Sequence, residues 1–166
     1  DAALGFDPRS EGSRVGLRAL LKRAEHRPDV VPVLLSAYNA ADDWRLVLDL
    51  TEHRLNAAKD CGTQIAILME AAKISELRAE DPDAAFALAR RALLLDPGAT
   101  RPLDGGDDAG ATVDELFRLA ALTRNFRSLA DALREAIEAA DGESDGPSPA
   151  FARGLRFRMG EVLETR

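Results

Sequence analysis

The chain has 166 residues and a formal net charge of −7, and 46% of its residues are hydrophobic while only 5% are aromatic. Few aromatic residues beside abundant alanine, leucine, arginine and glutamate favour closely packed helices over a sheet. The acidic balance argues against a nucleic-acid partner, and no apolar run approaches the roughly 18 to 20 residues that a membrane helix needs.

A single cysteine, Cys61, excludes an internal disulfide framework and favours a reducing, cytoplasmic location. The chain starts at Asp1 without an initiator methionine, which suggests a fragment or a processed product and leaves a removed leader open.

Hydrophobic periodicity predicts two helices in the first part of the chain, separated by a proline. The first is expected over about 12–26 and the second over about 29–41. Pro28 disfavours helical geometry in the residue before it, yet fits the first turn of the helix that follows. The apolar stripe of the second helix is expected to include Val30, Val31, Leu34, Leu35 and Tyr38.

A third helix is expected to run from a carboxylate cap to about Lys59. Asp42 or Asp43 can accept a hydrogen bond from the first turn of this helix. Trp44 comes directly after these carboxylates, and we expect it to pack rather than to stack on a ligand.

The next two helices are separated by a tight turn. After a short break at 60–62, a helix is expected over about 63–78. Asp81 followed by Pro82 is a strong start signal, because a carboxylate caps the helix and proline fits its first position. That helix is expected to end near residue 96.

The last third of the chain begins with residues 97–111, which lack periodicity and predict a loop. Thr112 and Glu115 form a capping box that opens a helix, and Asn125 caps the next one, which runs to Ala140. The predicted helices pair into hairpins over about 29–59, 63–96 and 112–140, flanked by single helices over about 12–26 and 149–165.

A weak internal repeat appears when residues 34–59 are laid on 116–141 at an offset of 82. Trp44 then meets Phe126 and Leu34 meets Leu116, so the match rests on apolar and capping positions rather than on identities. One helical hairpin cannot bury its apolar stripe alone, so repeated hairpins predict a stack.

Small residues recur at fixed spacing between Asp81 and Pro97. They are Ala85, Ala89 and Ala92, in the pattern Ala-x3-Ala-x2-Ala-x4-Pro. This run, with its closing Ala-Leu-Leu-Leu-Asp-Pro, resembles the second half of a tetratricopeptide repeat. In the preceding helix Leu68, Ala71 and Ala72 match the family's large, large and small positions, whereas Ser75 replaces its usual aromatic residue.

The resemblance implies an all-α, right-handed superhelical stack of antiparallel hairpins, with about seven or eight helices in one domain over residues 1–166. It further implies a non-catalytic scaffold that binds a peptide or protein segment on a concave surface. The inward-facing positions would include Gln64, Lys73, Arg118 and Arg153, whose charges would favour an acidic tail. The alternative is a regulatory or sensor module of a larger signalling or transcription protein.

No residue pattern predicts an enzyme, a cofactor or a metal centre. His26 and His53 lie apart on polar stretches beside arginines, and Cys61 lacks a flanking motif that would activate it. The acidic stretch 141–146 has the alternating carboxylates of a calcium loop, but Ala152 occupies the position that needs a bidentate glutamate.

Overall fold

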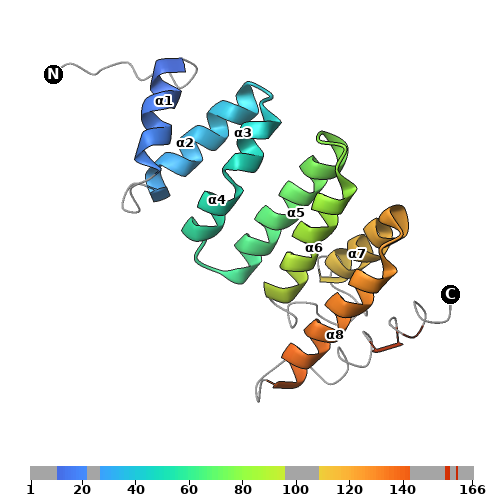
Figure 1. Cartoon of the computed structure of the whole chain (residues 1–166). Coiled ribbons are helices and arrows are strands. Elements are labelled where there is room, and N and C mark those ends of the chain that lie inside the picture. The colour runs from blue at the N-terminus through green and yellow to red at the C-terminus, as the bar shows by residue number, and fades with distance from the viewer. Residues whose placement is uncertain (1–10, 22–26, 96–108, 143–155, 158–159, 161–166) are drawn as a thin grey trace. The chain divides into compact units, whose positions relative to one another are not determined.

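A computed structural model describes residues 11–21, 27–95, 109–142, 156–157 and 160 (Figure 1). The described residues form eight α-helices and no strand, so the expected all-helical class is confirmed. The helices are α1 (Glu11–Leu20), α2 (Arg27–Ala40), α3 (Trp44–Asp49), α4 (Thr51–Ala57), α5 (Cys61–Leu77), α6 (Pro82–Leu95), α7 (Ala109–Thr123) and α8 (Phe126–Gly142).

The chain divides into two compact units. Unit 1 spans Asp1–Lys59 and contains α1 to α4, and unit 2 spans Asp60–Arg166 and contains α5 to α8. No helix in the described ranges is long and apolar enough to cross a membrane. Of the predicted helix over 149–165, the described residues are Arg156, Phe157 and Gly160, which are helical.

The helix predicted to run unbroken to Lys59 is interrupted at Leu50. This residue keeps helical angles, with φ −79° and ψ −11°, but its N–H donates to the carbonyls of both Leu46 and Val47, each at 3.2 Å. The backbone hydrogen bonding therefore shifts toward the tighter 3₁₀ pattern for one turn between α3 and α4. Figure 1 shows the ribbon change direction at this point. Periodicity alone does not reveal such a local tightening.

Three helix starts differ from their predicted positions, and the first is that of α2, which begins at Arg27 rather than at about 29, so the residue before Pro28 is helical. The prediction of a capping box at Thr112 is wrong, because α7 already begins at Ala109 and Thr112 is a buried residue inside this helix. The helix α5 begins at Cys61 rather than near Thr63, because the Asp60 side chain caps it and accepts hydrogen bonds from the Thr63 N–H and hydroxyl, both at 2.8 Å.

The same turn follows α2, α5 and α7. In each turn a non-glycine residue with positive φ stands directly before the N-cap residue: Asp42 at 53° before Asp43, Glu80 at 55° before Asp81, and Arg124 at 55° before Asn125. Each N-cap side chain accepts from an N–H three residues on, and each N-cap N–H donates back to the preceding helix. The predicted capping roles of Asp43, Asp81 and Asn125 are confirmed.

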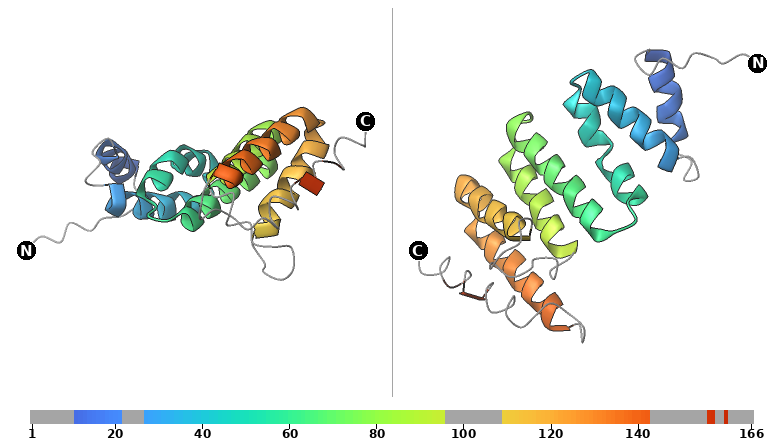
Figure 2. Two further views of the ribbon diagram at one scale, coloured as in Figure 1. Left: turned by 90° about the horizontal axis from the view of Figure 1, so that it is seen from below. Right: turned by 180° about the vertical axis from the view of Figure 1, so that it is seen from behind.

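These turns give the internal repeat a structural basis. Asp42 and Arg124 are 82 residues apart (124 − 42), which equals the offset at which the sequence was aligned. A left-handed residue followed by an Asp or Asn cap ends one helix and starts the next, so each pair forms an antiparallel hairpin. In unit 2 the two hairpin turns lie at the same end (Figures 1 and 2).

Unit 1 packs α2 against α1 and against both α3 and α4. Its buried apolar residues are Leu21, Val30, Val31, Leu34, Ala37, Tyr38, Val47, Leu50 and Leu55. The exposed Pro32 lies inside α2, where it cannot donate to the carbonyl of Pro28 in the first turn. The missing hydrogen bond falls in the exposed first turn, where water can replace the donor. Pro32 therefore does not end the helix, and α2 continues to Ala40.

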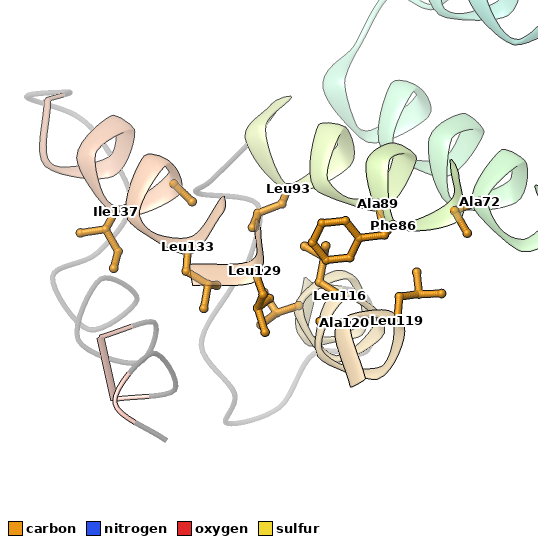
Figure 3. Packing of buried hydrophobic residues seen from close by; sticks show 13 residues of the cluster. Ala72, Phe86, Ala89, Leu93, Leu116, Leu119, Ala120, Leu129, Leu133 and Ile137 are labelled. Atoms are coloured by element: carbon orange, nitrogen blue, oxygen red, sulfur yellow. The ribbon is translucent and has the colours of Figure 1, made fainter. Parts of the chain in front are cut away.

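Unit 2 packs the α5–α6 hairpin against the α7–α8 hairpin, chiefly through α6 and α7. Its core cluster contains Ala72, Ala85, Phe86, Ala89, Leu93, Val113, Leu116, Leu119, Ala120, Leu129, Leu133, Ala136 and Ile137. Figure 3 shows Phe86 of α6 directed toward Leu116 of α7. The alanines on α6 let the neighbouring helices approach closely, as their spacing in the sequence predicts.

Candidate functional site

The predicted binding residues occupy different environments. Gln64 and Lys73 belong to α5 and Arg118 belongs to α7, while Arg153 lies outside the described residues. Gln64 is half-buried, whereas Lys73 and Arg118 are exposed. The three described members of the predicted set therefore differ in exposure.

Gln64 and Lys73 cannot line one surface of α5. Nine residues separate them (73 − 64), which is two and a half turns at 3.6 residues per turn, so they point to opposite sides. Gln64 stands four residues before the fully buried Leu68, on the packed side of the helix. Lys73 is left on the exposed side.

Arg118 joins α5 to α7 through two carboxylates. Its Nη1 and Nη2 donate to Glu76 of α5 at 2.8 and 2.5 Å, and its Nε and Nη2 donate to Glu115 of α7 at 2.8 and 2.6 Å. The guanidinium therefore binds both partners in a fork geometry, which a lysine could not reproduce. Glu76 retains only 15% of its side-chain exposure, compared with 48% for Arg118.

The electrostatics of this cluster follow from its geometry. The hydrogen bonds from Arg118 lower the pKa of Glu76, against the opposing effect of burial. The carboxylates of Glu115 and Glu76 raise the pKa of Arg118. Glu76 and Arg118 are therefore ionised at neutral pH, and the positive charge of Arg118 is already matched inside the protein.

The exposed side of α5 and α7 carries acidic residues and two leucines beside this cluster. We define the α5–α7 face as Glu70, Lys73, Glu76 and Leu77 of α5 with Asp114, Glu115, Arg118 and Leu122 of α7. Two basic side chains against four acidic ones leave a surplus of two negative charges on the face. The formal charge of the face is therefore negative, whereas the acidic tail was expected from the positive charges of Lys73 and Arg118 alone.

Both leucines of the face are exposed apolar side chains. Leu77 is 62% exposed at the end of α5, next to Glu76, and Leu122 is 56% exposed one turn beyond Arg118. The Glu76–Arg118 ion pair links the two helices through their side chains, and each leucine lies within one turn of one of its two members. Sequence periodicity places both outside the core, and the ion pair links the two helices that carry them.

A second ion pair joins the other helices of the two hairpins. Arg90 of α6 contacts Glu135 of α8 at 2.6 Å, and both side chains are about half exposed. Nothing in the local sequence pairs residues 45 apart, so neither this contact nor Glu76–Arg118 was predicted.

The other residues singled out from the sequence are Cys61, Trp44 and His53, which the structure describes, and His26, which lies outside the described residues. Cys61 is exposed at the first position of α5, and no group of three potential metal ligands occurs among the described residues. Trp44 is half-buried with the Arg45 guanidinium 4.4 Å from its ring centre. His53, expected at the surface, is half-buried, and its Nδ1 is buried.

Comparisons with protein-family models, with curated proteins and with solved structures found no match to this chain.

Proposed function

We propose that the chain is a non-catalytic protein-interaction module whose α5–α7 face receives a peptide segment from a protein partner. The observation that carries this proposal is the pair of exposed leucines, Leu77 and Leu122, beside an ion-pair cluster with a negative surplus. Neighbouring exposed apolar side chains rimmed by charge are typical of interaction sites.

The face specifies the chemistry of the segment. An apolar side chain can cover the two leucines, and covering each would contribute about 1–2 kcal/mol given their present exposure. Lysine or arginine on either side would meet the acidic surplus, and the chain's net charge of −7 steers a basic partner toward it. We therefore propose a segment with an apolar residue between basic residues.

The repeated turns support the finer assignment of the fold. We propose that the hairpins belong to a tetratricopeptide-like series, because each joins its helices through a left-handed residue and an Asp or Asn cap. Unit 2 presents the first helix of each hairpin, α5 and α7, on the proposed binding side.

Selection from a random peptide library displayed on phage tests the proposal. With the whole chain as bait, we expect enriched peptides to combine leucine or phenylalanine with neighbouring lysine or arginine. The Leu77→Gln/Leu122→Gln double variant should bind the selected peptides at least about tenfold more weakly. Val15→Gln is a matched control, because Val15 of α1 is 63% exposed and lies in unit 1.

Two outcomes would reject this function. Enriched peptides dominated by acidic residues would contradict the charge argument. Selected peptides that bind the leucine double variant and the Val15→Gln control equally well would place the binding site elsewhere on the chain.

A further inference from the structure

The break between α3 and α4 has no local cause in the sequence. Residues 44–57 contain neither glycine nor proline, the residues at which helices most often bend. Leu50 is nevertheless held at the break, only 2% exposed, with its N–H shared between two carbonyls. Tertiary packing in unit 1, rather than local propensity, therefore maintains the bend.

A pocket of about 180 Å³ lies at this bend. It is lined by Arg18, Leu21, Tyr38, Leu46, Asp49, Leu50 and His53. Four of these residues, at 46, 49, 50 and 53, share one side of the bent helix, because their spacing is i, i+3, i+4 and i+7. The bend thus forms one wall, and α1 and α2 contribute the others.

The pocket contains one positive and one negative side chain, which form only a long ion pair. Arg18 Nη2 and Asp49 Oδ2 are 3.7 Å apart, beyond hydrogen-bond distance, and the two side chains are 50% and 66% exposed. His53 Nδ1 is buried and has no hydrogen-bond partner within the part of the chain that the structure describes. Within the described residues, the pocket therefore combines apolar side chains with one cation, one anion, the tyrosine Tyr38 and one imidazole nitrogen without a hydrogen-bond partner.

We infer that this pocket binds a free α-amino acid with an apolar side chain, in its zwitterionic form. The carboxylate of the ligand pairs with Arg18, its ammonium group pairs with Asp49, and its side chain contacts Leu46 and Leu50. A neutral zwitterion matches a pocket whose two charges cancel, and it replaces a long ion pair with two charge-assisted hydrogen bonds. A water ordered by the bound ligand satisfies His53 Nδ1.

The volume fixes the size of the ligand. Pockets for larger cofactors span roughly 300–1,000 Å³, whereas a cavity of about 150 Å³ accommodates benzene. At about 180 Å³ the pocket takes one side chain of leucine size with its charged groups at the opening.

Calorimetric titration of the whole chain with L-leucine tests the inference. We expect saturable binding with a Kd in the millimolar range or tighter. N-acetyl-L-leucine, which lacks the ammonium group, and L-leucinamide, which lacks the carboxylate, should each bind about tenfold more weakly or not at all. These two compounds also distinguish a free amino acid from the end of a peptide chain.

Two substitutions test whether the ligand binds in this pocket. Arg18→Gln and Asp49→Asn change half-exposed side chains and should each weaken leucine binding about tenfold. Arg134→Gln is the matched control, because Arg134 forms a similarly exposed pair with Asp131 in unit 2. Imidazole NMR signals of His53 in the unmodified chain should shift during the leucine titration, which tests the site without any substitution.

Absence of saturable leucine binding overturns the inference. Equal binding of N-acetyl-L-leucine overturns the zwitterion and indicates a chain end instead. Leucine binding that persists in both variants, or that leaves the His53 signals unmoved, shows that the ligand occupies another place.

Discussion

Replacing Arg118 with glutamine removes the guanidinium that joins α5 to α7. We expect Arg118→Gln to lower the free energy of unfolding by about 1 kcal/mol at pH 7. An exposed ion pair contributes about 0.2–1 kcal/mol and a hydrogen bond to a charged group about 1.5–3 kcal/mol. Arg118 is 48% exposed, which screens the interaction, while Glu76 at 15% is mostly covered, so an intermediate value applies.

The effect should depend on pH in a defined direction. Arg118 lowers the pKa of Glu76 in the folded state, so the stabilisation is complete above the ordinary glutamate pKa of about 4.3. It is lost as the pH falls through the lowered folded pKa, because protonated Glu76 no longer attracts Arg118. The stability difference between the unmodified chain and Arg118→Gln should therefore shrink progressively below about pH 4.

Urea unfolding followed by circular dichroism measures this difference. Arg118→Gln, Glu76→Gln and the double variant close a cycle whose coupling free energy reports the pair directly. Arg134→Gln removes an exposed pair within one turn of α8 and should change stability by less than about 0.5 kcal/mol. A coupling near zero at pH 7, or one that does not change on acidification, would refute the reasoning.

Three further substitutions test the packing and the turns of unit 2 by the same unfolding assay. Leu116→Ala empties a fully buried position in the core and should cost about 2–5 kcal/mol, whereas Leu122→Ala on the surface should cost less than about 1 kcal/mol; similar values would contradict the core assignment. Arg124→Gly relieves a positive φ of 55° and should stabilise the chain by about 0.5–1 kcal/mol, and a loss of stability would speak against the left-handed turn. Asn125→Ala removes the cap that accepts from the Ser128 N–H and should cost about 0.5–2 kcal/mol, and a neutral result would show that the cap contributes nothing.

Local signals in the sequence predicted the helices of this protein well. Asp43, Asp81 and Asn125 each cap the helix that their position indicates, because a side chain that accepts from an N–H three residues further on needs no distant contact. The helical spacing of Ile65, Leu68, Ala71, Ala72 and Ser75 predicts one buried stripe on α5; the last four are buried, whereas Ile65 is half-buried.

Features that depend on tertiary contacts were not predicted. No glycine or proline marks the break at Leu50 in the sequence. The predicted capping box at Thr112 does not form, because α7 begins three residues earlier, at Ala109. Local sequence patterns carry no information on how far packing extends a helix beyond a favourable cap.

In the candidate site, too, local features could be predicted from the sequence and tertiary contacts could not. Helical spacing alone places Gln64 and Lys73 on opposite sides of α5, so their separation could have been predicted. The bond from Arg118 to Glu76 joins residues 42 apart and depends on how the two hairpins meet. That contact is what links the exposed residues of α5 and α7, including Leu77 and Leu122, across the two hairpins.

Methyl NMR of the chain with ¹³C-labelled leucine tests the proposed binding face most directly. On titration with a peptide selected for an apolar residue between lysines, we expect the methyl signals of Leu77 and Leu122 to shift, while those of the buried Leu93 and Leu133 stay in place. Shifts confined to leucines outside α5 and α7, with Leu77 and Leu122 unmoved, would contradict the account.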